Sequence, residues 1–242
     1  MGWRGPDHPD RMQAMVTLGP GGFDQLALQD VAIPHPTTGD VLIKVGAAGL
    51  NNTDLNTRVG WYGAASESEP TTAGAGGWNG ATPFPLIQGV DCGGTIVAVG
   101  DGVEESRIGE RVLVRPCMRV HGFDRPDTRW LGVDFNGAFA QFVVVPSSEA
   151  FAVTSTMSDV ELASFPCAYG TAEAMLERAD IRLGETVLVP GASGGVASAV
   201  VQLATLRGAR VIAVTKPEKA EALRALGANS VATRLLDLFD TP

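Results

Sequence analysis

The sequence predicts a chain of two parts: a β-rich part to about residue 150, and after it an α/β part with a parallel sheet. Before residue 150, short apolar or alternating runs are separated by Gly, Pro and Asp, as in strands joined by turns. From Glu185, strand-like and helix-like runs alternate, which is typical of a parallel sheet with right-handed crossovers. A glycine-rich turn separates the first such strand from its helix.

Composition and charge narrow the class of protein. The 242 residues are 45% hydrophobic and carry a net charge of −9, which argues against nucleic acid or an anionic membrane as partner. No apolar run approaches the roughly 20 residues that span a bilayer, and the N-terminus has no secretory h-region. Three scattered cysteines are too few for a disulfide framework. We therefore expect a soluble cytoplasmic protein with reduced thiols and a small-molecule substrate.

The first domain is expected over residues 12–150. Strand-like runs are "QAMVTL", "LALQDVAI" and "DVLIKVGAAGL", and later "CGGTIVAVG", "ERVLVRP" and "GAFAQFVVVP". Between these two groups, "LNNTDLNTRVGWYG" predicts a loop with a helical turn. Residues 63–83 are nearly all small or polar and predict a flexible surface excursion, since they have almost nothing to bury.

The second domain is expected over residues 151–242. Ser158 followed by Glu161 is a capping-box signature for a helix start, and "GTAEAMLERA" predicts another helix. The runs "ETVLVP", "GVASAVVQLATLRG", "ARVIAVT", "PEKAEALRALG" and "SVAT" then predict strand, helix, strand, helix and short strand. Pro217 at a first helical position and Gly227 just past the end fit the asymmetry of helix termini.

The glycine turn "VPGASGGVASAV" fits a dinucleotide-binding turn. Gly191 lets the chain turn tightly off the strand, Gly194 lets backbone N–H groups approach a pyrophosphate, and Ala197 takes the position of close helix–strand packing. A βα-turn without a ligand is the alternative. The other cofactor-binding candidates in the turn are Ser193, Gly195 and Val196.

The end of the second strand bears on the choice of cofactor. An NAD-preferring site places Asp or Glu there to bind the ribose 2′-hydroxyl, but this strand ends at Thr215, and Lys216 and Lys219 follow. A lysine attracts a 2′-phosphate, so we expect NADP(H) to be preferred over NAD(H). The alternative is that both lysines are solvated residues at a helix start.

The order of "GLNNTD", "PLIQGVDCGGTIVAVG", "GERVLV", "GAFAQFVVVP" and "GETVLVPGASGGVASAVVQLA" resembles the medium-chain dehydrogenase/reductase superfamily over residues 12–233. The resemblance implies a GroES-like β-rich domain followed by a Rossmann doubly wound parallel sheet, with a nicotinamide cofactor in the cleft between them. Thr171 resembles the threonine beside the nicotinamide end of that cofactor.

The resemblance also locates the positions of a catalytic zinc, and they are mostly unsuited to it. The Cys, His and Cys ligands of zinc-dependent relatives fall at Asn51, Val90 and Cys167, so only one position keeps its ligand. The four-cysteine structural zinc lobe is reduced to Cys117. His35 and His121 are interpreted as isolated surface histidines. No zinc is expected.

What remains is similar to the zinc-free branch of quinone oxidoreductases and enoyl reductases, whose pattern is matched at Asn51, Asp54, Arg58, Gly60 and Tyr62. Without a Lewis acid, hydrogen-bond donors must stabilise the charge that grows on a carbonyl or quinone oxygen. Asn51 and Tyr62 are the expected donors, with Tyr62 or water as proton source. Asp54 and Arg58 either belong to this site or form a structural ion pair that orients the loop.

The resemblance implies six strands in the second domain, of which this sequence supplies two or three. The Rossmann sheet is therefore expected to be incomplete, and the edge that usually makes the family's homo-oligomers is missing. Three hypotheses follow: a zinc-free NADP(H)-dependent oxidoreductase truncated at its C-terminus, a zinc-type alcohol dehydrogenase relative with a lost or relocated metal, and a non-catalytic fragment that at most binds nucleotide or a partner chain.

Overall fold

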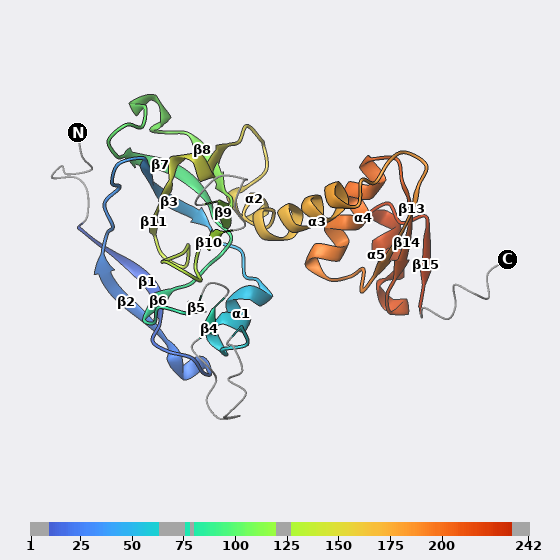
Figure 1. Cartoon of the computed structure of the whole chain (residues 1–242), viewed down its shortest axis with the longest axis horizontal. Helices are drawn as coiled ribbons and strands as arrows, with labels where there is room; N and C mark the ends of the chain where they lie inside the picture. The colour runs from blue at the N-terminus through green and yellow to red at the C-terminus, as the bar shows by residue number, and fades with distance from the viewer. Residues whose placement is uncertain (1–9, 63–75, 78–79, 120–126, 234–242) are drawn as a thin grey trace. The chain divides into compact units, whose positions relative to one another are not determined.

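The computed structural model of the chain describes residues 10–62, 76–77, 80–119 and 127–233. They belong to two compact units, Met1–Pro166 and Cys167–Pro242 (Figure 1). The sequence placed the boundary at residue 150, whereas the units divide after Pro166, because the short helix α2 (Asp159–Leu162) packs against strands β3 and β7 of the first unit. The predicted excursion at 63–83 lies largely outside the described residues.

Two antiparallel sheets form most of the first unit (Figure 1). One has the order β2-β1-β6 and the other the order β11-β3-β7-β8-β12. Their strands are β1 (Arg11–Thr17), β2 (Leu26–Ala32), β6 (Leu86–Ile87), β3 (Asp40–Ala47), β7 (Gly93–Val99), β8 (Arg111–Val114), β11 (Phe142–Pro146) and β12 (Ala150–Ala152). Two short pairs complete the described strands: β4 (Gly76–Gly77) with β5 (Gly80–Ala81), and β9 (Cys117–Arg119) with β10 (Thr128–Trp130).

The five-stranded sheet is buried on both faces. Val41 and Ile43 of β3 belong to one hydrophobic cluster, whereas Leu42 between them belongs to another. All three are fully buried because successive side chains of a strand point to opposite faces and each face has its own core. This explains why "DVLIKVGA" reads as a continuous apolar run instead of a strict alternation.

Helical segments in the first unit are short. They are α1 (Asn52–Arg58), α2, and the 3-10 turns η1 (Phe23–Gln25), η2 (Glu105–Arg107) and η3 (Ser147–Glu149). The helix start predicted at Ser158 is confirmed, because its backbone N–H donates to Glu161 Oε2 at 2.8 Å and its hydroxyl accepts from the Glu161 N–H.

The second unit contains the predicted parallel sheet, in the order β13-β14-β15 among its described strands. Its elements are α3 (Pro166–Arg178), β13 (Thr186–Pro190), α4 (Gly195–Leu206), β14 (Arg210–Val214), η4 (Pro217–Lys219), α5 (Ala220–Ala225) and β15 (Ser230–Ala232). The predicted helix from Pro217 begins as a 3-10 turn, and Gly227 follows its end with φ +110°.

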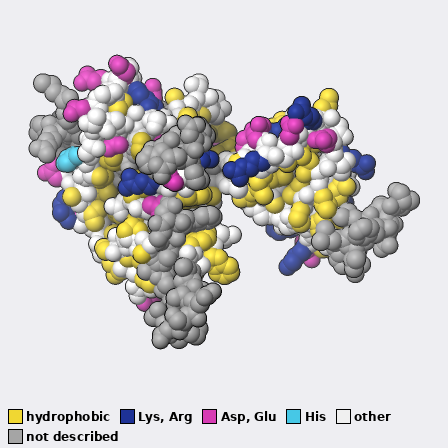
Figure 2. All heavy atoms as spheres, in the orientation of Figure 1, with side chains coloured by type: hydrophobic (Ala, Val, Ile, Leu, Met, Phe, Trp, Pro, Cys, Tyr) yellow, Lys and Arg dark blue, Asp and Glu magenta, His cyan; other side chains and the backbone are white. Residues whose placement is uncertain are grey.

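Much apolar surface of the second unit stays exposed. Its core is built from small residues, chiefly Ala and Val. Leu206 of α4 is 83% exposed and Leu188 of β13 is 45% exposed. Figure 2 shows hydrophobic side chains gathered over a broad area of this unit. Within the described part of the chain, no helix has both the length and the apolar character needed to cross a bilayer.

Candidate functional site

The first candidate site lies at the N-terminus of α1, where two of the four predicted catalytic residues, Asn51 and Asp54, meet. Asn51 is the N-cap residue, with φ −122° and ψ 160°, and its backbone N–H donates to Asp54 Oδ2 at 2.8 Å. This carboxylate at the third helical position closes the first turn, as in a capping box. A seven-residue helix is too short to be stable alone, so contacts of this kind fix its start.

Asp54 joins α1 to the segment that precedes β7. Its Oδ1 accepts hydrogen bonds from the backbone N–H groups of Gly89 at 3.1 Å and Val90 at 3.3 Å. The side chain is buried, and burial raises the pKa of Asp54 from its usual 3.8 to about 6. The backbone hydrogen bonds oppose this rise in pKa and the nearby carboxylate of Asp91 adds to it.

Asp91 is a functional candidate that the sequence reasoning missed. Its carboxylate is 2% exposed, and Oδ2 accepts a hydrogen bond from Asn51 Nδ2 at 2.7 Å. This bond fixes the orientation of the Asn51 amide, because only the NH2 end of the amide can donate to a carboxylate. The signal was available: Asp91 directly follows Val90, the position that the family pattern had already marked.

Gln88 and three glycines hold the segment 88–91 in place. Gln88 is buried, accepts from the Thr17 hydroxyl at 2.8 Å and donates to the backbone carbonyl of Asp54 at 2.8 Å. Gly89, Gly132 and Gly137 meet backbone to backbone: a Cβ added at Gly137 would lie 2.6 Å from the Gly132 Cα and overlap the Gly89 carbonyl oxygen. The polar site therefore rests on a tightly packed backbone.

The predicted ion pair between Asp54 and Arg58 does not form within the described residues. The Arg58 guanidinium instead donates to the carbonyl of Gly21 and lies over the Phe23 ring, 4.9 Å from its centroid. Arg58 thus ties the end of α1 to the loop after β1. Tyr62 follows this helix, and its hydroxyl accepts from Asn56 Nδ2 at 3.2 Å.

The positions expected for zinc ligands are divided between the two units. Asn51 and Val90 belong to the first unit, whereas Cys167 is the first residue of the second. Across residues 10–62, 80–119 and 127–233, no three His, Cys, Asp or Glu side chains gather in a way that would hold a metal ion. Cys117 and His35 stand apart from the Asn51–Asp54 network, and His121 lies outside the described residues.

The second candidate site is the glycine turn of the second unit. Gly191 has φ +62°, a left-handed conformation that favours glycine, and a Cβ there would meet nothing within 4 Å. The turn is closed by a hydrogen bond from the Gly194 N–H to the Gly191 carbonyl at 3.0 Å. Gly191, Ser193, Gly194 and Gly195 are all exposed, so the turn presents its backbone outward.

This turn leads into α4 with unpaired backbone donors. The Ser198 N–H donates to the Gly194 carbonyl at 2.8 Å, whereas the N–H groups of Gly195, Val196 and Ala197 have no acceptor among the described residues. Three such donors at the positive end of a 12-residue helix suit an anion such as a pyrophosphate. The geometry of the turn therefore fits a dinucleotide.

The remaining predicted cofactor residues lie on the same unit. The Thr215 side chain is buried and its backbone N–H bonds the Ala232 carbonyl at 3.0 Å, so Thr215 closes the sheet between β14 and β15. Lys216 precedes η4 and Lys219 is its last residue, and both lysines are exposed. Thr171 is an exposed residue of α3.

Comparison with known proteins places this architecture in a family. Residues 37–155 match the alcohol dehydrogenase GroES-like domain. The chain is 32% identical over 219 residues to an NAD-dependent alcohol dehydrogenase of Saccharolobus solfataricus, covering 85% of this chain and 60% of that protein. The similarity extends through both units. This chain belongs to the medium-chain dehydrogenase/reductase superfamily.

Further medium-chain dehydrogenase/reductase relatives support the assignment. The human synaptic vesicle membrane protein VAT-1 homolog-like is 34% identical over 215 residues, covering 88% of this chain and 43% of its own length. A solved structure of an alcohol dehydrogenase-like protein from Sinorhizobium meliloti 1021 is 45% identical with a TM-score of 0.87, covering 95% of this chain and 64% of that one. The quinone oxidoreductase of Coxiella burnetii is 26% identical with a TM-score of 0.74, covering 95% and 65%. The chain thus spans less than two thirds of each of these relatives.

Proposed function

We propose that this chain carries the cofactor-binding turn and the substrate-polarising groups of a zinc-free, NADP(H)-dependent oxidoreductase of the alcohol dehydrogenase/quinone oxidoreductase type. Its substrate would be a quinone, an enone or a carbonyl compound. The observation that carries the proposal is the exposed turn at Gly191, followed by the N–H groups of Gly195, Val196 and Ala197, which have no acceptor in the described part of the chain. Family membership supports the reaction type.

The nicotinamide, when bound, supplies a hydride to an electron-poor carbon, and negative charge then grows on the substrate oxygen. In this proposal the Asn51 amide donates a hydrogen bond to that oxygen. One N–H of the Asn51 side-chain amide donates to Asp91, and this bond holds the second N–H of the amide in a fixed direction. Such a fixed donor costs no reorganisation as the charge develops, and loss of one donor of this kind lowers rate about 10²- to 10³-fold. The Tyr62 hydroxyl is proposed as a second donor or as the proton source.

That the site works without zinc is part of the proposal, and the chemistry of the residues at the expected ligand positions supports it. Valine at position 90 has no donor atom, and the Asn51 amide is a neutral ligand already bonded to Asp91. Zinc-bound structures are found among the solved relatives, including an alcohol dehydrogenase from Pyrobaculum aerophilum. A zinc content of one per chain in metal analysis would overturn this part of the proposal.

The preference for NADP(H) rests on the two exposed lysines. Lys216 lies two residues after β14, Lys219 ends η4, and the single carboxylate between the two lysines is Glu218. A lysine at the strand end favours a ribose 2′-phosphate, whereas several relatives are named NAD-dependent and one was solved with NADH. Calorimetric titration of the purified chain with NADPH and NADH is the test. NADPH should bind at least tenfold more tightly, and Lys216→Ala should abolish the difference. Tighter binding of NADH than of NADPH would refute the proposed preference for NADP(H).

Turnover is tested by the loss of NADPH absorbance with benzoquinone and with an enone. Asn51→Ala should lower the rate 10²- to 10³-fold without changing NADPH affinity, and Asn52→Ala, at the exposed neighbouring position, is the matched control. Turnover of simple alcohols that a chelator abolishes would favour a zinc-type alcohol dehydrogenase.

A second candidate is a non-catalytic nucleotide-binding chain. It needs the glycine turn alone, whose exposed backbone donors require no residue of the first unit to meet a nucleotide. Binding of NADPH without turnover of any quinone or enone would establish this second function in place of the first.

A further inference from the structure

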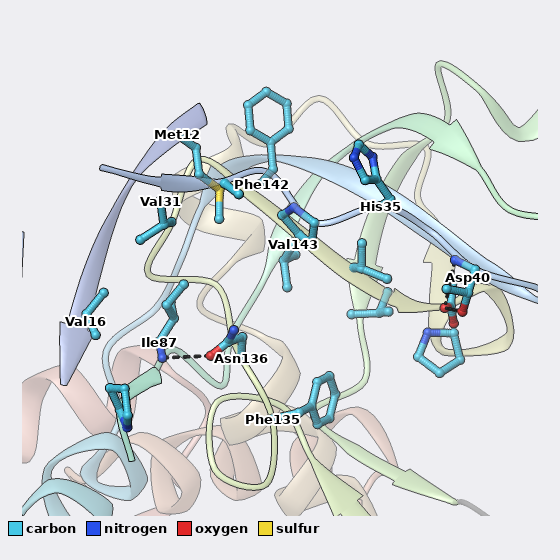
Figure 3. Close-up of a pocket in the computed structure, with 18 of the residues that line it drawn as sticks. Met12, Val16, Val31, His35, Asp40, Ile87, Phe135, Asn136, Phe142 and Val143 are labelled. Carbon is cyan, nitrogen blue, oxygen red and sulfur yellow. Dashed lines mark hydrogen bonds between the residues drawn. The ribbon is translucent and has the colours of Figure 1, made fainter. Parts of the chain in front are cut away.

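The first unit contains a cavity apart from the polar site at α1. It has a volume of about 570 Å³, within the range of small-molecule sites. Neither the α1 network nor Asp91 contributes to its lining. Figure 3 shows Met12, Val16 and Val31 of β1 and β2 along one wall. Nothing in the proposed hydride transfer uses this space.

The walls of the cavity are built from core residues. Met12, Val16, Ile87 and Phe142 belong to one hydrophobic cluster and are each less than 8% exposed. Val31 of β2 packs against this cluster. The wall is therefore preformed by packed strands, and an aliphatic chain placed against it would leave water without displacing a side chain.

Polar groups border the cavity unequally. At one border lies the loop 135–137: the Arg129 guanidinium lies 4.2 Å from the centroid of the Phe135 ring, and Asn136 Oδ1 accepts from the Ile87 N–H at 3.0 Å (Figure 3). The bond to Ile87 fixes the amide, so the Asn136 NH2 group points away from Ile87. No carboxylate lies within ion-pair distance of Arg129 in the described part of the chain.

The other side of the cavity carries a negative charge. His35 and Asp40 lie there in Figure 3, and the Asp40 carboxylate already accepts from the Thr37 hydroxyl at 2.6 Å. An anion at that side would meet Asp40. An anion at the loop 135–137 would instead meet the Arg129 guanidinium, which has no carboxylate partner among the described residues and whose planar fork matches a carboxylate, and the amide donor of Asn136.

We propose that this cavity binds an aliphatic monocarboxylate, with its chain along β1 and β2 and its carboxylate on Arg129 and Asn136. The arrangement separates an apolar wall from a cationic, donor-rich end, as an amphiphilic acid requires. It does not depend on the proposed function, because none of these residues takes part in hydride transfer.

The test uses the full chain with methionine methyl groups labelled with carbon-13, titrated with octanoate or octanol. Met12 lines the cavity, whereas Met175 is an exposed residue of the second unit and reports non-specific binding. Octanoate should shift the Met12 methyl signal and leave Met175 unchanged. It should bind at least tenfold more tightly than octanol.

Arg129→Gln should lower the affinity for octanoate at least tenfold and leave the affinity for octanol unchanged, because the substitution removes the cation and keeps the apolar wall of the cavity. Arg129 is exposed, so this variant is expected to fold. The exposed Arg178→Gln in α3 removes the same charge from the second unit and should leave octanoate binding unaltered. Equal affinity for octanoate and octanol, an unchanged Arg129→Gln variant, or an unmoved Met12 signal would each overturn the proposal.

Discussion

Replacing Asp54 by Asn removes a carboxyl group whose pKa is higher in the folded protein than in the unfolded chain. With a pKa of about 6 in the folded protein and 3.8 when unfolded, Asp54 favours folding most below pH 4. That contribution is lost as pH rises through 6, because the folded state then has to ionise a buried carboxyl. A difference of about two pKa units corresponds to about 3 kcal/mol. The stability advantage of the wild type over Asp54→Asn should therefore fall by about 2 kcal/mol between pH 4 and pH 7, which is most of the full difference.

Urea unfolding followed by tryptophan fluorescence measures this difference at each pH. All four tryptophans belong to the first unit, so the signal reports on the unit that contains Asp54. The Asp54→Asn substitution also changes the acceptors offered to Gly89 and Val90, which adds an offset of about 1–3 kcal/mol at every pH. The slope with pH is therefore diagnostic, and the exposed Asp24→Asn is the control. A difference that is flat, or that grows in favour of the wild type as pH rises, would refute the reasoning.

Three other substitutions follow from the packing. Gly137→Ala should destabilise the first unit by about 3 kcal/mol in the same urea assay, because its methyl would collide with the Gly89 backbone; an unchanged midpoint would contradict this. Gln88→Leu should cost about 2 kcal/mol, since the Thr17 hydroxyl loses its buried partner, and it should retain near-wild-type secondary structure by circular dichroism. Gly191→Ala should cost the second unit about 1 kcal/mol by thermal unfolding, because the strain there is confined to the backbone.

Strands, helices and the glycine turn were predictable because their signals are local. The capping pair Ser158–Glu161 and the positive φ of Gly191 follow from residue type and spacing within a few positions. The continuous apolar run in β3 indicated a strand, but that its two faces meet different cores depends on the whole unit.

The candidate site was only half predictable, for the same reason. Asn51 and Asp54 share one helical turn, so their association was readable from spacing. Asp91 lies 40 residues away from Asn51 and meets it through the fold. An ion pair between Asp54 and Arg58 was plausible from their i, i+4 spacing. Arg58 instead donates to the Gly21 carbonyl and lies over the Phe23 ring, and these contacts cannot be predicted from neighbouring residues in the sequence.

The order of the second unit's strands also sets how its amide hydrogens exchange with solvent. β14 lies between two neighbours, so its amides should exchange only when the sheet opens. β13 pairs with β14 alone among the described strands. The hydrogen bond from the Arg210 N–H to the Glu185 carbonyl shows which residues of β13 point their backbone groups toward β14. The amides of Val187 and Val189 then face β14, whereas those of Thr186 and Leu188 face outward. Deuterium should therefore enter β13 at every second residue long before it reaches β14.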